Sequence, residues 1–188
     1  MKIGFAFCGS FCTFAPAIEQ LKHLADIGHE MIPIMSFNAS SIDTRFGAAA
    51  DHIAKIESIC GRRVIKTIAD AEPLGPKEKL DMLIICPCTG NTLAKMALGI
   101  TDTPVTMAAK AHLRCDRPLL IALATNDALS ANLSNLNAMQ KRKSVYFVPL
   151  TQDDPEKKPH SLVCDFTKLS ESFYAALRGE QLRPLFLN

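Results

Sequence analysis

The sequence contains no long block of basic residues. Its 21 lysines and arginines are spread along the chain and balanced by 19 acidic residues, which leaves a formal net charge of +2. Surfaces that bind nucleic acids or anionic membranes usually concentrate positive charge in one place. The composition therefore argues against nucleic-acid binding and against attachment to a membrane surface.

Long apolar runs are also absent. No segment approaches the roughly 20 apolar residues that a membrane-spanning helix requires, and the run before Gly9 is too short for the apolar part of a secretory leader. The seven cysteines are an odd number and lie mostly in or beside apolar segments, which is typical of reduced thiols in a cytosolic protein. We therefore expect a cytoplasmic protein.

Several well-known site motifs are missing. The turn "CGSFCT", residues 8–13, has neither the spacing of a glycine-rich dinucleotide fingerprint nor that of a phosphate loop with its lysine. No two histidines have the helical spacing of a metal site, and the C-x-x-x-C and C-x-C pairs do not have the usual zinc spacing. We therefore expect no metal, and we interpret Cys88 as a residue that lines a pocket rather than as a redox nucleophile.

What the sequence does contain is a regular alternation of apolar strands and amphipathic helices. Because parallel strands need crossover helices, this alternation predicts a doubly wound, Rossmann-like or flavodoxin-like α/β fold with six parallel strands. Residues 1–188 form one domain of ordinary size. The predicted strands are 2–7, 30–36, 63–68, 80–86, 118–125 and 144–150. The predicted helices are 16–27, one that contains Ile53, Ile56 and Ile59, 91–98, 104–114, one that ends near Arg142, and 167–178.

In folds of this kind, ligands bind beyond the carboxyl ends of the strands. The turn after the first strand offers Gly9 for close backbone approach, the hydroxyls of Ser10 and Thr13, and the amides of a following helix, a combination that suits a phosphate. An ordinary strand-to-helix turn remains the alternative. Ser36, at the end of the second strand, adds a hydroxyl on the same side.

Positive side chains lie in two of the loops at this edge. "DDPEKKPH", residues 153–160, carries Lys157 and Lys158, and "DTRFG" places Arg45 after the second strand. Charged runs are most often solvated loops, but these cations are also suited to an anionic substrate. We therefore take Arg45, Lys157 and Lys158 as candidate substrate-binding residues.

The segment that follows the fourth predicted strand has a distinctive pattern, Pro87-Cys88-Thr89-Gly90-Asn91-Thr92-Leu93-Ala94-Lys95 with Gly99, Ile100 and Asp102. It resembles the signature P-A-S-x-N-T-x-A-K-x-x-x-G-I-x-D of the flavin-binding cysteine-decarboxylase-like flavoprotein superfamily. That family's glycine-serine turn matches Gly9-Ser10. Its proline-alanine-methionine-asparagine segment is echoed by residues 124–127.

The resemblance implies FMN as the cofactor, with its phosphate at the first turn and its ring system over the asparagine-threonine turn. It assigns Gly9, Ser10 and Phe11 to the phosphate side, with help from Ser36. Near the flavin it places Cys88, Thr89, Asn91 and Thr92. Asn126, in the segment that echoes the family pattern, joins the candidate substrate residues. The resemblance assigns no catalytic residue.

Further segments, among them "TRFG", "AEPLGPK" and "YFVPLTQDDPEKKP", are similar to one branch of the superfamily along the whole chain. The branch implies an oligomeric oxidoreductase subunit that acts during sporulation on a small dicarboxylate of the lysine pathway. Because no dinucleotide fingerprint is present here, a separate partner subunit would bind NAD(P). The alternatives are a flavin-dependent decarboxylase or prenyltransferase, or a non-catalytic flavin-fold partner. The histidine of the decarboxylases is missing from residues 68–80, which argues against cysteine decarboxylation.

Overall fold

Five apolar segments form a parallel sheet in the computed structural model, which describes residues 1–187. Its strands lie in the order β2-β1-β3-β4-β5, the order found in flavodoxin-like folds. They are β1 (Lys2–Phe7), β2 (Glu30–Met35), β3 (Met82–Cys88), β4 (Leu119–Thr125) and β5 (Val145–Phe147). The order reverses at β1 and β3, and such a reversal is where ligands bind in these folds.

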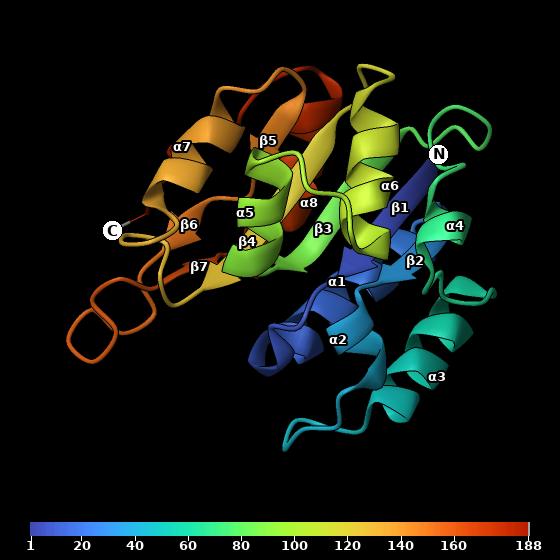
Figure 1. Cartoon of the computed structure of the whole chain (residues 1–188), viewed down its shortest axis with the longest axis horizontal. Coiled ribbons are helices and arrows are strands. Elements are labelled where there is room, and N and C mark those ends of the chain that lie inside the picture. Colours follow the sequence, from blue (N-terminus) through green and yellow to red (C-terminus); the bar gives the residue numbers. More distant parts are fainter. Residues whose placement is uncertain (188) are drawn as a thin grey trace.

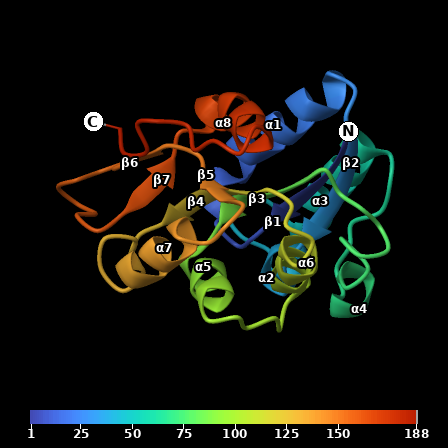
Figure 2. The same ribbon diagram turned by 90° about the horizontal axis from the view of Figure 1, so that it is seen from above.

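Helices cover both faces of this sheet. Figure 2 shows α1 and α8 on one face and α5, α6 and α7 on the other. These helices are α1 (Phe14–Asp26), α8 (Leu169–Leu177), α5 (Gly90–Ala97), α6 (Pro104–Leu113) and α7 (Leu133–Gln140). Because both faces are covered, the central strands are apolar along almost their whole length, as the fully buried residues of β3 illustrate.

Smaller elements complete the chain. Helix α3 (Ala49–Cys60) contacts α1 and β2. The short segments are α2 (Phe37–Ser41), α4 (Ile68–Ala71) and the 3₁₀ turns η1 (Phe11–Thr13) and η2 (Phe166–Lys168). Within residues 1–187, no helix is both long and apolar enough to span a bilayer.

The predicted parallel sheet of six strands is corrected in two places. Residues 63–68 form no strand, although Ile65 bridges to Ile34 of β2. The sheet has seven strands, because β6 (Leu150–Thr151) and β7 (Leu162–Cys164) pair antiparallel beside the end of β4. Figure 1 shows the loop between them extending from one side of the sheet. The doubly wound α/β prediction is confirmed.

The predicted boundary signals hold at two helices. Thr89 caps α5 by accepting a hydrogen bond from the amide of Thr92, at 3.2 Å. Thr103 and Thr106 form a capping box before α6, whose first residue is Pro104. These caps satisfy amides that a helix start otherwise leaves unpaired.

Candidate functional site

The turn after β1 is held against the turn after β3. The amide of Cys8 donates to the carbonyl of Pro87 at 3.0 Å, and the hydroxyl of Thr92 donates to the sulfur of Cys8 at 3.3 Å. A Cβ added at Gly9 would have ordinary contacts of 3.5 Å with Asn38 and Phe11. Gly9 is therefore not required by close packing inside the protein, and its bare backbone borders open space.

The start of α5 is packed against the turn that follows β4. A Cβ on Gly90 would lie 2.6 Å from the hydroxyl of Thr125, 2.6 Å from the amide nitrogen of Asn132 and 2.8 Å from a carboxylate oxygen of Asp127. Real Cβ atoms do not approach other atoms this closely. Glycine is therefore the only residue that allows these two turns to meet as they do.

Two adjoining cavities open at this carboxyl edge of the sheet, and Gly9 and Thr89 border both. The larger one has a volume of about 530 Å³. It is lined by Gly9, Ser10, Phe11, Cys12, Thr13, Thr44, Phe46, Thr89, Ala124, Thr125, Asn126, Asp153, Lys158, Ser161 and Val163. The smaller one has a volume of about 270 Å³ and is lined by Gly9, Ser36, Phe37, Asn38, Thr89, Asn91, Thr92, Lys95, Asp102 and Thr103.

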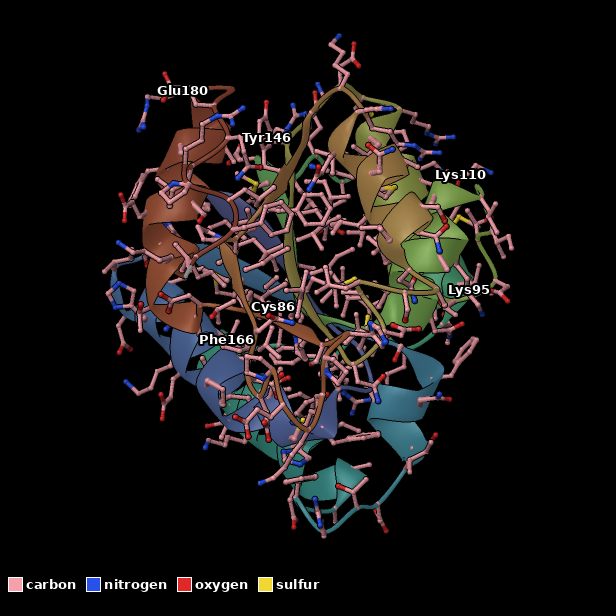
Figure 3. The ribbon with its side chains drawn as sticks, turned by 90° about the vertical axis from the view of Figure 1, so that its left-hand side faces the viewer. Cys86, Lys95, Lys110, Tyr146, Phe166 and Glu180 are labelled. Atoms are coloured by element: carbon pink, nitrogen blue, oxygen red, sulfur yellow. The ribbon has the colours of Figure 1, made fainter. Side chains whose placement is uncertain are left out.

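The smaller cavity combines hydroxyl groups with an ion pair between Lys95 and Asp102. The Lys95 ammonium donates to both oxygens of Asp102, at 2.9 and 2.8 Å. Figure 3 shows Lys95 at the outer surface of the molecule, whereas Cys86 lies in its interior. Side-chain hydroxyls, side-chain amides and a positive charge are the groups that bind phosphate in proteins. The hydroxyl and amide groups therefore suit a phosphorylated ligand, which would compete with Asp102 for Lys95.

The larger cavity carries one ion pair. The Lys158 ammonium lies 2.5 Å from an Asp153 oxygen, and this hydrogen bond lowers the pKa of Asp153 and raises the pKa of Lys158. Among residues 1–187, Asp153 and Lys158 are the only charged residues in the lining. The cavity therefore has no net charge until an anion competes with Asp153 for the lysine.

Most residues that the sequence analysis proposed for binding cofactor or substrate line one of these cavities. Those that line the larger one are Gly9, Ser10, Phe11, Thr89, Asn126 and Lys158, and those that line the smaller one include Ser36, Asn91 and Thr92. The Ser36 oxygen also accepts from the amide of Ala39 at 3.3 Å, so it caps α2.

Three nominated residues lie outside both linings. Cys88 is fully buried, contrary to its expected place beside a ligand, because Thr89 and not Cys88 turns toward the cavities. Lys157 is exposed, and its backbone amide donates to Asp154. Arg45 stacks on Phe46 with its guanidinium carbon 4.9 Å from the ring centroid. Phe46 itself lines the larger cavity, so Arg45 is close to its rim.

Three of the buried cysteines, Cys8, Cys86 and Cys88, are held as neutral thiols. Burial raises the pKa of Cys8 to about 11 and raises the pKa values of Cys86 and Cys88 well above the ordinary value, which keeps these thiols protonated. Cys12, in contrast, is exposed and lines the larger cavity. The described part of the chain has no group of three or more metal-ligating side chains placed to hold an ion.

Sequence reasoning missed four polar residues of the larger cavity: Thr44, Thr125, Asp153 and Ser161. Asp153 lies in the same charged loop as Lys158, and opposite charges five residues apart were a usable signal. Thr125 and Ser161 are brought together by the pairing of β4 with β7, since Ser161 donates to the carbonyl of Thr125 at 3.3 Å. Nothing local in the sequence indicates that pairing.

Fold and site together define a flavodoxin-like α/β protein with two cavities lined by hydroxyl, amide and lysine groups at the carboxyl edge of its sheet. The sequence model of the family described as Flavoprotein matches residues 1–173, and the chain belongs to this family.

Among known proteins, the chain is 43% identical to the B subunit of dipicolinate synthase from Bacillus subtilis, over 99% of this chain and 93% of the relative. A crystal structure of the corresponding B subunit from Bacillus halodurans shares 38% identity, with a TM-score of 0.91 over 100% of this chain and 96% of the other. The branch indicated by the sequence is thereby identified. The FMN-dependent cysteine decarboxylase SpaF shares the fold, with 22% identity and a TM-score of 0.69 over 95% and 97% of the two chains.

Proposed function

We propose that this chain works as the B subunit of a dipicolinate synthase. Together with the NAD(P)-binding A subunit of that enzyme, it takes part in oxidising a dihydrodipicolinate-type intermediate to dipicolinic acid during sporulation. The observation that carries the proposal is the similarity to two dipicolinate synthase B subunits from end to end. The cytoplasm of the mother cell, where such a synthase would work, is part of the proposal.

FMN is the cofactor we assign to the two cavities. Its phosphate is suited to the smaller cavity, where Ser36, Asn91 and Thr92 offer polar groups beside Lys95. This assignment departs from the one that the resemblance implies, which places Asn91 and Thr92 near the ring and Phe11 near the phosphate. Its ring is suited to the larger cavity, which Phe11 and Phe46 line with apolar surface. Gly9 and Thr89 border both cavities, so one elongated ligand can extend from one to the other. When bound, FMN would supply a reversible two-electron carrier.

The chain's own contribution at the larger cavity is to bind and orient the dicarboxylate. Within the described part of the chain, Lys158 is the only cation that lines this cavity, and Lys158 would exchange Asp153 for a substrate carboxylate. Asn126 offers amide donors from the opposite loop. We assign Arg45 and Lys157 to the rim, where their charges attract a dianion without direct contact.

The assignment of Lys158 leads to a test with a neighbouring control. K158A should raise the substrate KM of the reconstituted complex by roughly five- to tenfold, because it removes a charge-assisted hydrogen bond. K157A, which removes the same charge one residue away and outside the cavity lining, should change KM by less than about twofold. Equal effects of the two variants would overturn the assignment.

The function itself is tested by reconstitution. Dipicolinate formation should require this chain, the A subunit, NAD(P) and the dihydrodipicolinate intermediate, and the purified chain should acquire flavin absorbance when FMN is added. If FMN binds but a cysteine-ending peptide is decarboxylated instead, the chain is a decarboxylase. If no flavin binds and the chain only stabilises the A subunit, it is a non-catalytic partner.

A homo-oligomer is also part of the proposal. Phe37, Ile42 and Phe46 are large apolar side chains that remain between 43% and 45% exposed, and Phe37 and Phe46 line the two cavities. Association would remove this apolar surface from water. Light scattering should give a mass that is a multiple of 20.5 kDa, and a monomer at micromolar concentration would refute it.

A further inference from the structure

A chain of four polar side chains runs from helix α7 to the larger cavity. The amide nitrogen of Asn135 donates to the Asn132 oxygen at 3.0 Å, and the amide nitrogen of Asn132 donates to Asp127 Oδ2 at 2.8 Å. The hydroxyl of Thr125 donates to Asp127 Oδ1 at 2.6 Å. Thr125 lines the larger cavity, so the chain ends at the ligand edge.

These contacts fix the donor and the acceptor of each hydrogen bond among the four side chains. An ionised carboxylate only accepts, and a hydroxyl has a single proton. Because that proton is given to Asp127, the Thr125 oxygen has only lone pairs left. Any further polar partner of this hydroxyl must therefore be a donor.

The surroundings hold the arrangement in place. Asn132 is buried, and the start of α5 lies against all three of Thr125, Asp127 and Asn132, as the space around Gly90 shows. The carboxylate beside the first residue of α5 is electrostatically favourable, since helix starts carry partial positive charge. Among residues 1–187, Asp127 forms no ion pair with a lysine or arginine that could redirect it.

We propose that Asp127 is a positioning residue that presents the Thr125 hydroxyl to the larger cavity as a hydrogen-bond acceptor, so that this position selects a heterocycle with an N–H group at its edge. The inference rests on the proposed function, which supplies two such heterocycles: the oxidised flavin, whose ring has its N–H at N3, and the dihydropyridine-type substrate in its enamine or protonated-imine form, which carries a ring N–H.

The decisive variant is D127N, because it reverses the polarity of Thr125. Asn135 donates to the Asn132 oxygen and so fixes the orientation of the Asn132 side chain, with its nitrogen toward residue 127. The Asn132 nitrogen therefore donates to the oxygen of the new amide at position 127. The NH₂ of that amide then faces Thr125 and donates to it. The Thr125 proton is turned toward the cavity, where it meets the N–H of the ligand. D127N should therefore impair binding more than T125V, which only removes the hydroxyl.

The matched control is D165N. Asp165 accepts from the hydroxyl of Thr167 at the same 2.6 Å and also from its amide at 3.0 Å, but it caps a turn that lines neither cavity. D165N thus makes the same chemical change away from the site. T125S, which keeps a hydroxyl, serves as the conservative rescue.

Two measurements separate the two heterocycles. The Kd of FMN is measured by fluorescence titration of the chain alone, and the substrate KM is measured with the A subunit present. In the measurement whose ligand donates to Thr125, T125V should weaken binding about fivefold and D127N by more than that, while T125S and D165N stay within twofold of wild type. If N3–H of the flavin is the donor, N3-methyl-FMN should lose this sensitivity, since valine and threonine have the same shape.

The outcomes are distinct. If wild type binds FMN and turns over substrate while T125V and D127N remain within twofold of it in both measurements, the inference is wrong and the proposed function stands. If D165N is as impaired as D127N, the effect is loss of stability and the inference is also wrong. If wild type neither binds FMN nor supports turnover, the proposed function fails and the inference with it.

Discussion

At the residue scale, the site depends on how closely two turns approach each other. Gly90 at the start of α5 lies against polar atoms of Thr125, Asp127 and Asn132, which are themselves joined by hydrogen bonds. Because the three neighbours hold one another, none of them can move aside without breaking a hydrogen bond. The bare backbone of Gly90 is therefore a requirement of the site's geometry.

Gly90→Ala should lower the free energy of unfolding by about 1 to 3 kcal/mol, as expected when a methyl group is forced into a packed position. The comparison is Gly9→Ala, whose methyl would have ordinary 3.5 Å contacts and which should change stability by less than about 0.5 kcal/mol. Urea denaturation of both variants checks this. Equal stability of the two variants would show that the turns are not in close contact.

His112 provides a pH-dependent effect on stability. It is fully buried in α6, one ring nitrogen bonds to the carbonyl of Pro118 at 2.9 Å, and burial lowers its pKa from 6.5 to about 4. The unfolded chain therefore binds this proton more readily than the folded chain between pH 6.5 and 4. The contribution of neutral His112 to the free energy of unfolding is fully present above pH 6.5. It decreases as the pH falls, by about 2 kcal/mol at pH 5.

His112→Gln keeps a donor for Pro118 and removes the titration. It should cost stability at pH 7.5 through poorer packing, but its disadvantage relative to wild type should shrink by about 2 kcal/mol at pH 5. Urea denaturation of both proteins across this pH range is the measurement. Because other titrating groups are common to both, parallel pH profiles would contradict a depressed pKa for His112.

At the scale of elements, a side chain takes the place of a strand at the edge of the sheet. Gln181 follows α8, and its side chain accepts from the amide of Phe147 at 2.8 Å and donates to the carbonyl of the same residue at 2.7 Å. This is the pattern that a neighbouring strand would supply to β5. The amide side chain thus satisfies the edge of β5 from the C-terminal segment.

Gln181→Ala should lower the free energy of unfolding by about 1 to 3 kcal/mol, since it leaves two backbone groups of Phe147 without their partner. The amide of Phe147 should also exchange hydrogen faster. Gln152→Ala, which removes a single exposed hydrogen bond to Pro159, is the control and should cost less than about 0.5 kcal/mol. Unchanged protection of Phe147 in Q181A would refute the role of Gln181.

The elements that sequence patterns predicted are those whose burial is local and continuous. Strands β1, β3 and β4 are apolar along their length, and the caps at Thr89 and Thr103 mark the starts of α5 and α6. Residues 63–68 have a strand-like composition, but Pro33 on the facing strand has no N–H to donate. Pairing there is limited to two hydrogen bonds around Ile65.

The short strands β6 and β7 were not predictable because their pattern is too short and their pairing is not local in the sequence. Two or three residues carry too little pattern, and β7 exists because Ala124 and Thr125 offer it an edge. The larger cavity includes Thr125 on β4 and Ser161 and Val163 beside or in β7, so its wall depends on that pairing. The sequence therefore indicated most of the residues that line the two cavities but not the shape of the larger one.

At the scale of the whole molecule, the two cavities lie where the strand order reverses. Gly9 follows β1 and Thr89 follows β3, the two strands at the reversal, and both residues border both cavities. Helices leave from the two strands to opposite faces, which opens the crevice between their turns. The site is thus a consequence of topology, and the side chains select the ligand.

This arrangement predicts how ligands shift the stability of the whole chain. A ligand present at 100 times its Kd stabilises the folded state by about 2.7 kcal/mol. For a domain of this size, that corresponds to a rise in Tm of about 5 to 10 °C with FMN. Riboflavin lacks the phosphate for the smaller cavity, so at equal concentration its shift should be much smaller.

Gly9→Ala, whose methyl group borders both cavities, should reduce the FMN shift although the fold remains stable. Differential scanning fluorimetry with FMN, riboflavin and inorganic phosphate measures these effects. Equal shifts with FMN and riboflavin would show that the smaller cavity does not bind the phosphate.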